Sequence, residues 1–297
     1  MTTIADLRCA VLPHAGRCDT ALPRLRIYSS ARPTELLATI YDPVVCLILQ
    51  GAKRTVIGDK PLEYGAGDCL VVAAEVAAMV QISRASSDCP YLALNLSLDP
   101  EMISALLVDM AGMPESSTTP GFSVSPASPL LLDAWRRMVE LLDRPDEMQV
   151  MAPRVEEEVL FRLLMGPQGS ILRQIAGTDS RLWRIRRAMK WIREHYAERL
   201  SIGAMANIAN MSPSVFHRRF KAVTGLSPLQ YQKQVRLHEA RRQILSEGAT
   251  ALSVGFMVGY ESASQFSREY KRLFGEPPRR DASAMQFVLP VNNFPAK

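Results

Sequence analysis

Two segments in the last third of the chain place arginine, lysine, serine and glutamine side chains at matching positions. MSPSVFHRRFKAVTGLSP at 211–228 aligns with ESASQFSREYKRLFGEPP at 261–278, at an offset of 50 residues. Seven pairs are identical: Ser212/Ser262, Ser214/Ser264, Phe216/Phe266, Arg218/Arg268, Lys221/Lys271, Gly225/Gly275 and Pro228/Pro278. Arginine and glutamine form paired hydrogen bonds with guanine and adenine, and basic side chains bind phosphate. The repeat therefore carries the side-chain chemistry of nucleic-acid recognition.

Each copy is predicted to form one amphipathic helix. Serine suits the helix start at Ser212 and Ser262, and glycine suits the left-handed helix end at Gly225 and Gly275. A period of about 3.6 residues gathers the apolar positions on one face: Phe216, Phe220, Val223, Phe266, Tyr270 and Leu273. The opposite face carries Ser214, His217, Arg218 and Lys221 in the first copy and Ser264, Ser267, Arg268 and Lys271 in the second, with Gln265 toward its edge.

A short apolar segment precedes each copy, SIGAMANIAN at 201–210 and LSVGFMVGY at 252–260. Two helices joined by a few residues are typical of a helix-turn-helix unit, whose second helix enters the major groove of DNA. A duplicated helical hairpin that serves only for packing is the alternative. The basic outward faces disfavour it, because they repel each other unless an anionic partner is present.

Charge is distributed unevenly along the chain. The net formal charge is −6 over residues 1–177 and +11 over residues 178–297, although the whole chain carries only +5. Positive charge concentrated in one segment indicates a polyanionic partner, because each basic side chain placed on a phosphate releases condensed counterions. Charge alone also fits a solvated basic surface or one that faces a membrane.

The residues around and between the two copies resemble a known family. GLSPLQYQKQVRLHEARRQIL at 225–245 and VGYESASQFSREYKRLFGEPPRRD at 258–281 resemble the DNA-binding domain of the AraC/XylS-type transcription regulators. The resemblance covers about Arg181 to Asp281. It implies an all-α domain with two helix-turn-helix units that a long helix near Pro228–Ser246 connects rigidly, so that both second helices address successive major grooves.

The same resemblance implies roles for individual side chains. It assigns base reading to Ser214, His217, Arg218, Ser264, Gln265 and Arg268. Phosphate contacts are expected from Ser212, Arg219, Lys221, Ser262, Lys271 and Arg272. His217 is also compatible with a surface histidine that makes no contact. Gly255 stands where the family carries alanine, and because glycine inside a helix costs about 0.5–1 kcal/mol relative to alanine, the second unit is expected to be the looser one.

Short apolar runs separated by Gly-Asp and Pro signals, from about Arg24 to Leu98, predict short strands in a sandwich or small barrel. QGAKRTVIGDKPLEYGAGDCLVV followed by YLALNLSLDP resembles the cupin-like regulatory domain of one branch of the same family. The Ser-, Thr- and Pro-rich segment 111–129 is predicted to be a loop. Amphipathic helices are expected between residues 128 and 165, and GPQGS with IAGTDS predicts a boundary ahead of the basic part.

These patterns predict an α+β multidomain protein. We expect a cupin-like, effector-binding β-barrel over residues 1–115, a loop and helices for dimerisation or coupling over 116–177, and a double helix-turn-helix domain over 178–297. The expected function is sequence-specific transcription regulation, with double-stranded promoter DNA, a small-molecule effector, a second copy of the chain and, for an activator, RNA polymerase as partners. A barrel that only dimerises is the alternative. No cofactor or membrane partner is expected, and the location is expected to be cytoplasmic because no signal peptide or membrane span is evident.

Two enzyme classes remain as rivals. A cupin-type metalloenzyme needs clustered histidines, but only His14 lies in the first half, and Glu63, Asp68 and Glu75 are interpreted as solvated turn and strand residues. A thiol-based DNA-repair or sensor protein needs reactive cysteines. The five cysteines are irregularly spaced, which favours reduced thiols with a buried, apolar fate: Cys9, Cys18, Cys46, Cys69 and Cys89.

Overall fold

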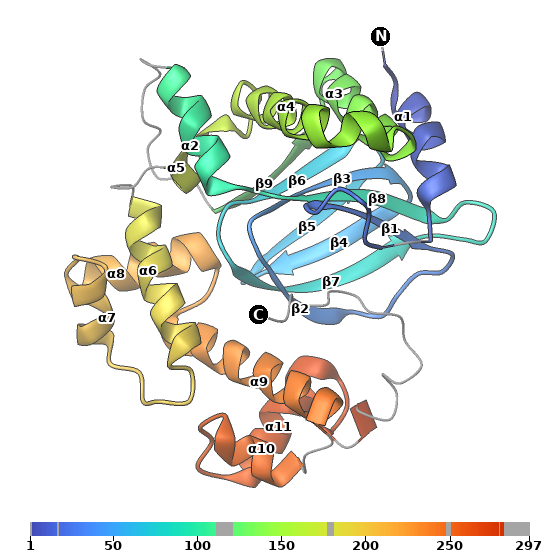
Figure 1. Ribbon diagram of the computed structural model, residues 1–297. Coiled ribbons are helices and arrows are strands. Elements are labelled where there is room, and N and C mark those ends of the chain that lie inside the picture. The colour runs from blue at the N-terminus through green and yellow to red at the C-terminus, as the bar shows by residue number, and fades with distance from the viewer. Residues whose placement is uncertain are drawn as a thin grey trace.

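The apolar runs of the first half form two antiparallel sheets in a computed structural model that describes residues 2–16, 18–110, 121–176, 181–247, 251–278 and 280–281. One sheet has the order β1-β8-β3-β6-β9 and the other β2-β7-β4-β5. The strands are β1 (Leu25–Ser30), β2 (Leu37–Tyr41), β3 (Val44–Gln50), β4 (Ala52–Ile57), β5 (Lys60–Gly65), β6 (Asp68–Val72), β7 (Val76–Arg84), β8 (Tyr91–Ser97) and β9 (Phe122–Pro126). The two sheets face each other as a barrel (Figure 1), as predicted.

Both faces of the five-stranded sheet are buried. Along β3, Cys46 and Ile48 point into the barrel, whereas Val45, Leu47 and Leu49 join a second core outside it. Three helices cover that outer face in Figure 1: α1 (Ile4–Val11), α3 (Pro129–Glu140) and α4 (Pro145–Leu164). Burial on both faces explains why this strand is continuously apolar rather than alternating.

The predicted loop at 111–129 is wrong for residues 122–126. These residues form β9, which pairs with β6 in the register Asp68↔Pro126 to Val72↔Phe122 and forms one edge of the sheet. The segment is rich in serine and proline, which favour loops. The alternation Phe-Ser-Val is too short to indicate a strand against that composition. Residues 111–120 lie outside the described residues.

The basic part consists of helices joined by short connections, as predicted. They are α6 (Arg181–Glu194), α7 (Ile202–Ile208), α8 (Pro213–Thr224), α9 (Pro228–Glu247), α10 (Ala251–Met257) and α11 (Ala263–Phe274). The pairs α7–α8 and α10–α11 form two helix-turn-helix units with α9 between them (Figure 1). Two helices, α2 (Pro100–Asp109) and α5 (Gly169–Ala176), lie between the barrel and α6. The boundary predicted at 177 falls at 177–180, outside the described residues.

The two units are anchored differently. Buried side chains of the first unit, including Phe216, Phe220 and Tyr231, belong to the same hydrophobic cluster as the helices that cover the barrel. The second unit has a separate cluster that includes Phe266 and Tyr270. The first unit therefore shares its core with the regulatory half, whereas the second packs on α9 and contacts the barrel through α11 and β2.

The repeated serines and glycines lie at equivalent ends of α8 and α11. Ser262 caps α11 by accepting a hydrogen bond from the Gln265 backbone N–H at 3.5 Å, while Ser212 stands at the start of α8 without such a bond. Both helices end at a glycine with positive φ, Gly225 at 75° and Gly275 at 85°. These φ values require the left-handed conformation that glycine adopts without strain.

Gly255 has a packing role that the sequence did not reveal. A Cβ atom at this position in α10 would lie 2.9 Å from Cδ1 and 3.0 Å from Cγ of Phe266. Phe266 is 1% exposed and central to the second unit. The glycine thus allows α10 and α11 to approach closely, and the expected looseness of this unit does not follow from its helix propensity alone.

We expect Gly255→Ala to destabilise the second unit. Overpacking a filled core costs about 1–3 kcal/mol, which exceeds the gain of about 0.5–1 kcal/mol in helix propensity. Thermal unfolding measures the difference. Gly203→Ala in α7 is the matched control, because its Cβ would meet only the Ser201 hydroxyl at 3.9 Å. The control should raise the unfolding midpoint, and a Gly255→Ala protein as stable as the control would contradict the close-packing role.

Candidate nucleic-acid interface

The predicted base-reading side chains lie on the outward faces of α8 and α11. Five of the six are solvent-exposed with the regulatory half in place: Ser214, His217, Arg218, Ser264 and Arg268. Gln265 is half-buried, and its amide donates a hydrogen bond to Glu269 at 3.3 Å within the same helix. Five of these side chains are therefore open to solvent, although α11 also contacts strand β2 of the barrel. Gln265 uses one of its amide hydrogens on Glu269.

The predicted phosphate-binding residues surround these faces. Four are exposed, namely Ser212, Lys221, Lys271 and Arg272, and two are half-buried, namely Arg219 and Ser262. The hydroxyls of Ser262 and Ser264 lie 2.9 Å apart at the start of α11. The structure gathers all twelve predicted positions on the two second helices or at their N-terminal caps, and contact with DNA stays a prediction.

Arg236 ties the two units together. From the middle of α9, its guanidinium donates hydrogen bonds to backbone carbonyls of Tyr196 at 2.6 Å, Ala197 at 3.1 Å and Glu198 at 2.9 Å, all before α7. It also donates to the Gly259 carbonyl at 2.7 Å, after α10. Burial lowers the pKa of Arg236. One side chain thus holds four carbonyl groups from both units.

The two units also touch directly through their backbones. A Cβ atom at Gly259, where φ is +91°, would lie 2.3 Å from the Ala197 carbonyl oxygen. A side chain at this position would therefore separate the units. Close backbone contact and the Arg236 bonds together fix the position of α8 relative to α11.

Asp281 secures the end of the second unit. It is 5% exposed and accepts two hydrogen bonds from Arg241 of α9, both at 2.8 Å, and one from the Tyr270 hydroxyl at 2.7 Å. The Arg241 guanidinium also lies 4.5 Å from the Phe274 ring centroid. Burying a carboxylate costs free energy unless it is paired with an opposite charge and hydrogen-bonded, and Asp281 meets both conditions.

Glu75 is buried, contrary to its interpretation as a solvated residue. It lies between β6 and β7, is 6% exposed, accepts a hydrogen bond from the Tyr231 hydroxyl at 3.1 Å and forms an ion pair with Arg193. Burial raises the pKa of Glu75 to about 7, although Arg193 and Tyr231 oppose the increase. Arg193 belongs to α6 and Tyr231 to α9, so Glu75 joins the barrel to the two helices that flank the first unit. Of the other two carboxylates, Glu63 is exposed and Asp68 is half-buried.

Two glycines also contribute to this domain contact. A Cβ at Gly58, in the β4–β5 turn, would lie 2.3 Å from the carbonyl oxygen of Gly225 at the end of α8. A Cβ at Gly121 would lie 2.8 Å from the Val223 carbonyl oxygen. The end of the first recognition helix therefore rests directly on barrel backbone.

The sequence did not single out Glu75, Arg236 or Tyr231 as functional residues. Their roles come from contacts between segments far apart in the chain, and neither periodicity nor local spacing encodes such contacts. A cue existed for Glu75, because it interrupts the apolar run CLVVAAEVAAMV.

The described residues also bear on the rival classes. They contain no group of three or more His, Cys, Asp and Glu side chains arranged to hold a metal ion. Burial was expected for the cysteines and is found for Cys46 and Cys69, whereas Cys18 is half-buried and Cys9 and Cys89 are exposed. Among the helices of the described part, none has the length and apolar character that crossing a bilayer requires.

Two family models match the chain. The AraC-type transcriptional regulator N-terminus matches residues 21–171, and a helix-turn-helix domain matches residues 205–283. The first match alone covers more than half of the chain. The chain belongs to the family of AraC-type transcriptional regulators, with an N-terminal regulatory domain and a C-terminal helix-turn-helix domain.

The chain is also similar to curated transcription regulators. The chain is 30% identical over 155 residues to the HTH-type transcriptional activator RhaS of Escherichia fergusonii, which covers 50% of this chain and 55% of the relative. It is 26% identical over 151 residues to RhaS of Escherichia coli O1:K1 / APEC, with 50% and 53% covered. The chain thus spans about half the length of the curated relatives it matches.

Solved structures extend the similarity in fold to both domains. ToxT of Vibrio cholerae strain SCE256, with an unsaturated fatty acid bound, superposes with a TM-score of 0.59 at 9% identity and covers 86% of this chain and 93% of ToxT. ToxT of Vibrio cholerae O395, with (E)-4-(8-methylnaphthalen-1-yl)but-3-enoic acid bound, gives a TM-score of 0.58 at 10% identity, with 88% and 98% covered. At such identity the likeness concerns the fold, and it confirms the predicted fold class.

We expect Arg236→Lys to lower the free energy of unfolding by about 3 kcal/mol, because one ammonium group cannot reach four carbonyls and hydrogen bonds to charged groups contribute about 1.5–3 kcal/mol each. Urea unfolding provides the measurement. Arg242→Lys on the same helix is the control, since Arg242 pairs with Glu239 at a largely exposed site and such pairs contribute about 0–1 kcal/mol. Equal losses in the two variants would show that Arg236 does not join the units.

Glu75 should make stability depend on pH. Its pKa in the folded protein is about 7, above the usual value of about 4.3 for an unfolded chain, so the folded state binds more protons between these values. The free energy of unfolding should therefore fall as pH rises from 5 to 7.5. Glu75→Gln, which preserves the shape, should remove about 1–3 kcal/mol of that fall. Urea unfolding of both proteins across this range provides the test, and parallel pH curves would exclude the assigned burial.

Proposed function

We propose that this protein is a non-enzymatic, sequence-specific transcription regulator whose two helix-turn-helix units bind one stretch of promoter DNA. The observation that carries the proposal is the pair of open polar faces on α8 and α11, which Arg236 holds at a fixed separation. A rigid pair of recognition helices matches DNA segments whose major grooves face the same side of the duplex. The names of the RhaS relatives, all transcriptional activators, support this function.

Base reading is proposed for Ser214, His217, Arg218, Ser264, Gln265 and Arg268. The two arginines carry most of the discrimination, because a guanidinium pairs with guanine through two hydrogen bonds and both are exposed. Phosphate binding is proposed for Ser212, Arg219, Lys221, Ser262, Lys271 and Arg272. These contacts set the register and affinity without reading sequence.

Control by a small-molecule effector belongs to the same proposal. The regulatory half contacts the first unit through Glu75, Arg193 and Tyr231, so a ligand with different affinities for the docked and undocked arrangements shifts their populations. Support also comes from the ToxT structures, which hold an unsaturated fatty acid and a naphthalenyl butenoic acid. For the present chain we propose the division into regulatory, coupling and DNA-binding parts near residues 115 and 177.

A second copy of the chain is a further proposed partner. Large apolar side chains are exposed on α3 and α4, with Leu130 at 58%, Val150 at 56% and Met151 at 39%. Burial of such side chains between two copies is favourable, and apolar patches often mark protein contacts. If the protein activates transcription, RNA polymerase is its partner at the promoter, and the site of action is the cytoplasm, where that DNA lies.

We expect Arg218→Ala or Arg268→Ala to relax base preference at defined positions, with about 1–3 kcal/mol of discrimination lost at each. Lys271→Ala should instead weaken binding to all sequences and reduce the slope of log K against log salt by about 1. The measurement is the affinity of purified protein for a selected duplex and its single-base variants at several salt concentrations.

Arg199→Ala provides a control for the loss of one exposed positive charge on the same domain but outside α8 and α11. It should preserve the base preferences of the unmodified protein. Unchanged preference in both Arg218→Ala and Arg268→Ala would remove the base-reading assignment, and an absence of specific DNA binding by the full chain would refute the proposed function itself.

A further inference from the structure

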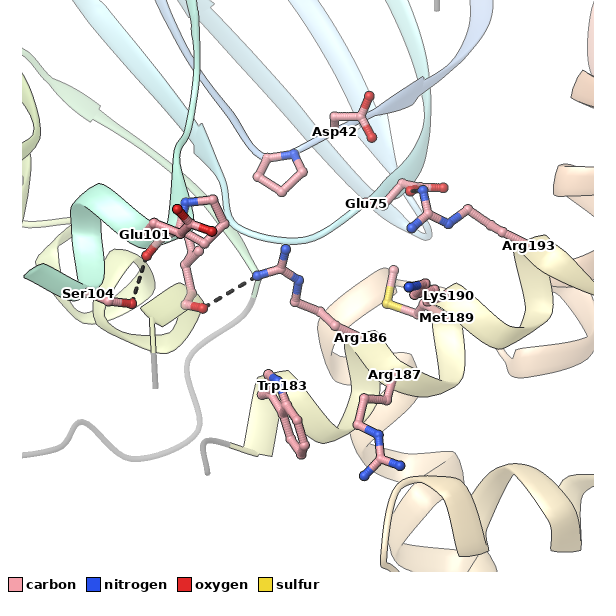
Figure 2. Close-up of a pocket in the computed structure, with 13 residues that line it drawn as sticks. Asp42, Glu75, Glu101, Ser104, Trp183, Arg186, Arg187, Met189, Lys190 and Arg193 are labelled. Atoms are coloured by element: carbon pink, nitrogen blue, oxygen red, sulfur yellow. Dashed lines mark hydrogen bonds and ion pairs between the residues drawn. The ribbon is translucent and has the colours of Figure 1, made fainter. Parts of the chain in front are cut away.

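A cavity of about 520 Å³ lies where the regulatory half meets the helical half. Its walls come from the rim of the barrel, including Asp42 and Glu75, and from α2, α5 and one side of α6 (Figure 2). Small-molecule sites typically occupy about 300–1,000 Å³ and often form between domains. A molecule in this cavity would touch both halves of the protein at once.

Arg186 occupies the centre of this cavity. Figure 2 shows its side chain reaching from α6 toward the barrel rim, whereas Arg187 points away and stacks on Trp183 with its guanidinium 5.0 Å from a ring centroid. The guanidinium of Arg186 donates one hydrogen bond, to the Ile175 carbonyl oxygen at 3.4 Å. It forms no ion pair with any residue that the structure describes. Since a guanidinium has five N–H donors, most of its bonding capacity faces the cavity.

The carboxylates around the cavity do not neutralise Arg186. Glu75 is engaged by Arg193 and Tyr231, while Asp42 and Glu101 line the cavity without an ion pair to Arg186. Burial lowers the pKa of Arg186 and the neighbouring Arg193 lowers it further, while the charge of Glu75 opposes this decrease only in part. Burial and the repulsion by Arg193 both disfavour the charged guanidinium. An anion bound to Arg186 supplies a counter-charge and so stabilises that charged form.

The remaining wall combines apolar side chains with charged ones, among which Lys190 and Arg193 also line the cavity. Side chains that line the cavity beside Arg186 include Pro43, Pro100, Ile175, Trp183 and Met189. Ile175 and Met189 are each 2% exposed and form a fixed floor. The cavity thus combines a guanidinium at its centre, and further basic side chains in its wall, with hydrophobic surface. This is the chemistry that recognises a molecule with an acidic group and an apolar body.

We propose that this cavity binds a small organic anion, with its carboxylate or phosphoryl group on Arg186 and its apolar body against Ile175 and Met189. The inference rests on the proposed regulator function and deepens it by naming the chemical class and the site of the effector. The bound anion bridges the barrel rim and α6, so it favours the arrangement in which the first helix-turn-helix unit is docked. Glu75 lies at the same rim, and its negative charge opposes the incoming anion.

The test is a titration of the full-length protein with three probes that share one aromatic body: phenylacetate, phenyl phosphate and uncharged 2-phenylethanol. Isothermal calorimetry at constant ionic strength measures the binding. We expect saturable binding of at least one acid, with 2-phenylethanol at least tenfold weaker. Phenylacetate alone would assign a carboxylate, and phenyl phosphate alone would assign a phosphoryl group.

Four variants make the assignment specific. Arg186→Gln should weaken binding of the acid at least tenfold, and Arg186→Lys should retain part of it. Glu75→Gln should tighten binding several-fold, because it removes the opposing charge, and a purely structural role of Glu75 would not produce a gain. Arg199→Gln, which changes an exposed arginine outside the cavity, should leave binding unchanged.

Failure of both acids to bind saturably, or equal affinity in Arg186→Gln and the unmodified protein, would overturn the anion site. DNA affinity of the full chain, measured without any probe, separates this inference from the function on which it rests. Specific DNA binding with no anion binding would refute only the site. Anion binding lost in Arg186→Gln, without specific DNA binding, would sustain the site and refute the regulator function.

Discussion

The hydrogen bonds of the Arg236 guanidinium to four backbone carbonyls constrain the rest of the DNA-binding half. Three of these carbonyls precede α7 and one follows α10, so the bonds connect the two units across α9. The bonds to Tyr196 and Gly259 are part-buried, and a buried carbonyl that loses its charged donor is left without a partner. The fixed relation of α8 to α11, on which two-site DNA recognition depends, follows from this arrangement.

The regulatory half acts on this rigid pair from one side. It shares a hydrophobic cluster with the first unit, touches the end of α8 through Gly58 and Gly121, and engages α6 and α9 through Glu75. The second unit keeps its own cluster. The side chains on the outward faces of both recognition helices are exposed in this arrangement, while α11 also contacts strand β2 of the barrel. Regulation through the position of the first unit, transmitted by the domain contact, agrees with this geometry.

Much of the fold was predictable because local rules decided it. The 50-residue repeat indicated both units, since capping, glycine ends and aromatic spacing recur within each copy. The strands of the barrel followed from short apolar runs between turn signals. Strand β9 was not predicted, because the extended conformation of Phe122–Pro126 depends on pairing with β6 rather than on a local pattern. Glu75 and Gly255 were misjudged for a similar reason. The ion pair of Glu75 with Arg193 and the contact of Gly255 with Phe266 join parts of the chain that no sequence period relates.

The central claim is that two recognition helices, held at one separation, read two segments of the same DNA. The direct measurement is to select a binding site from random duplexes and then insert five base pairs between its two protected segments. The account predicts two segments about one helical turn apart and an affinity that drops to that of a single segment after the insertion. A selected site with one segment, or an affinity that the insertion leaves unchanged, would contradict it.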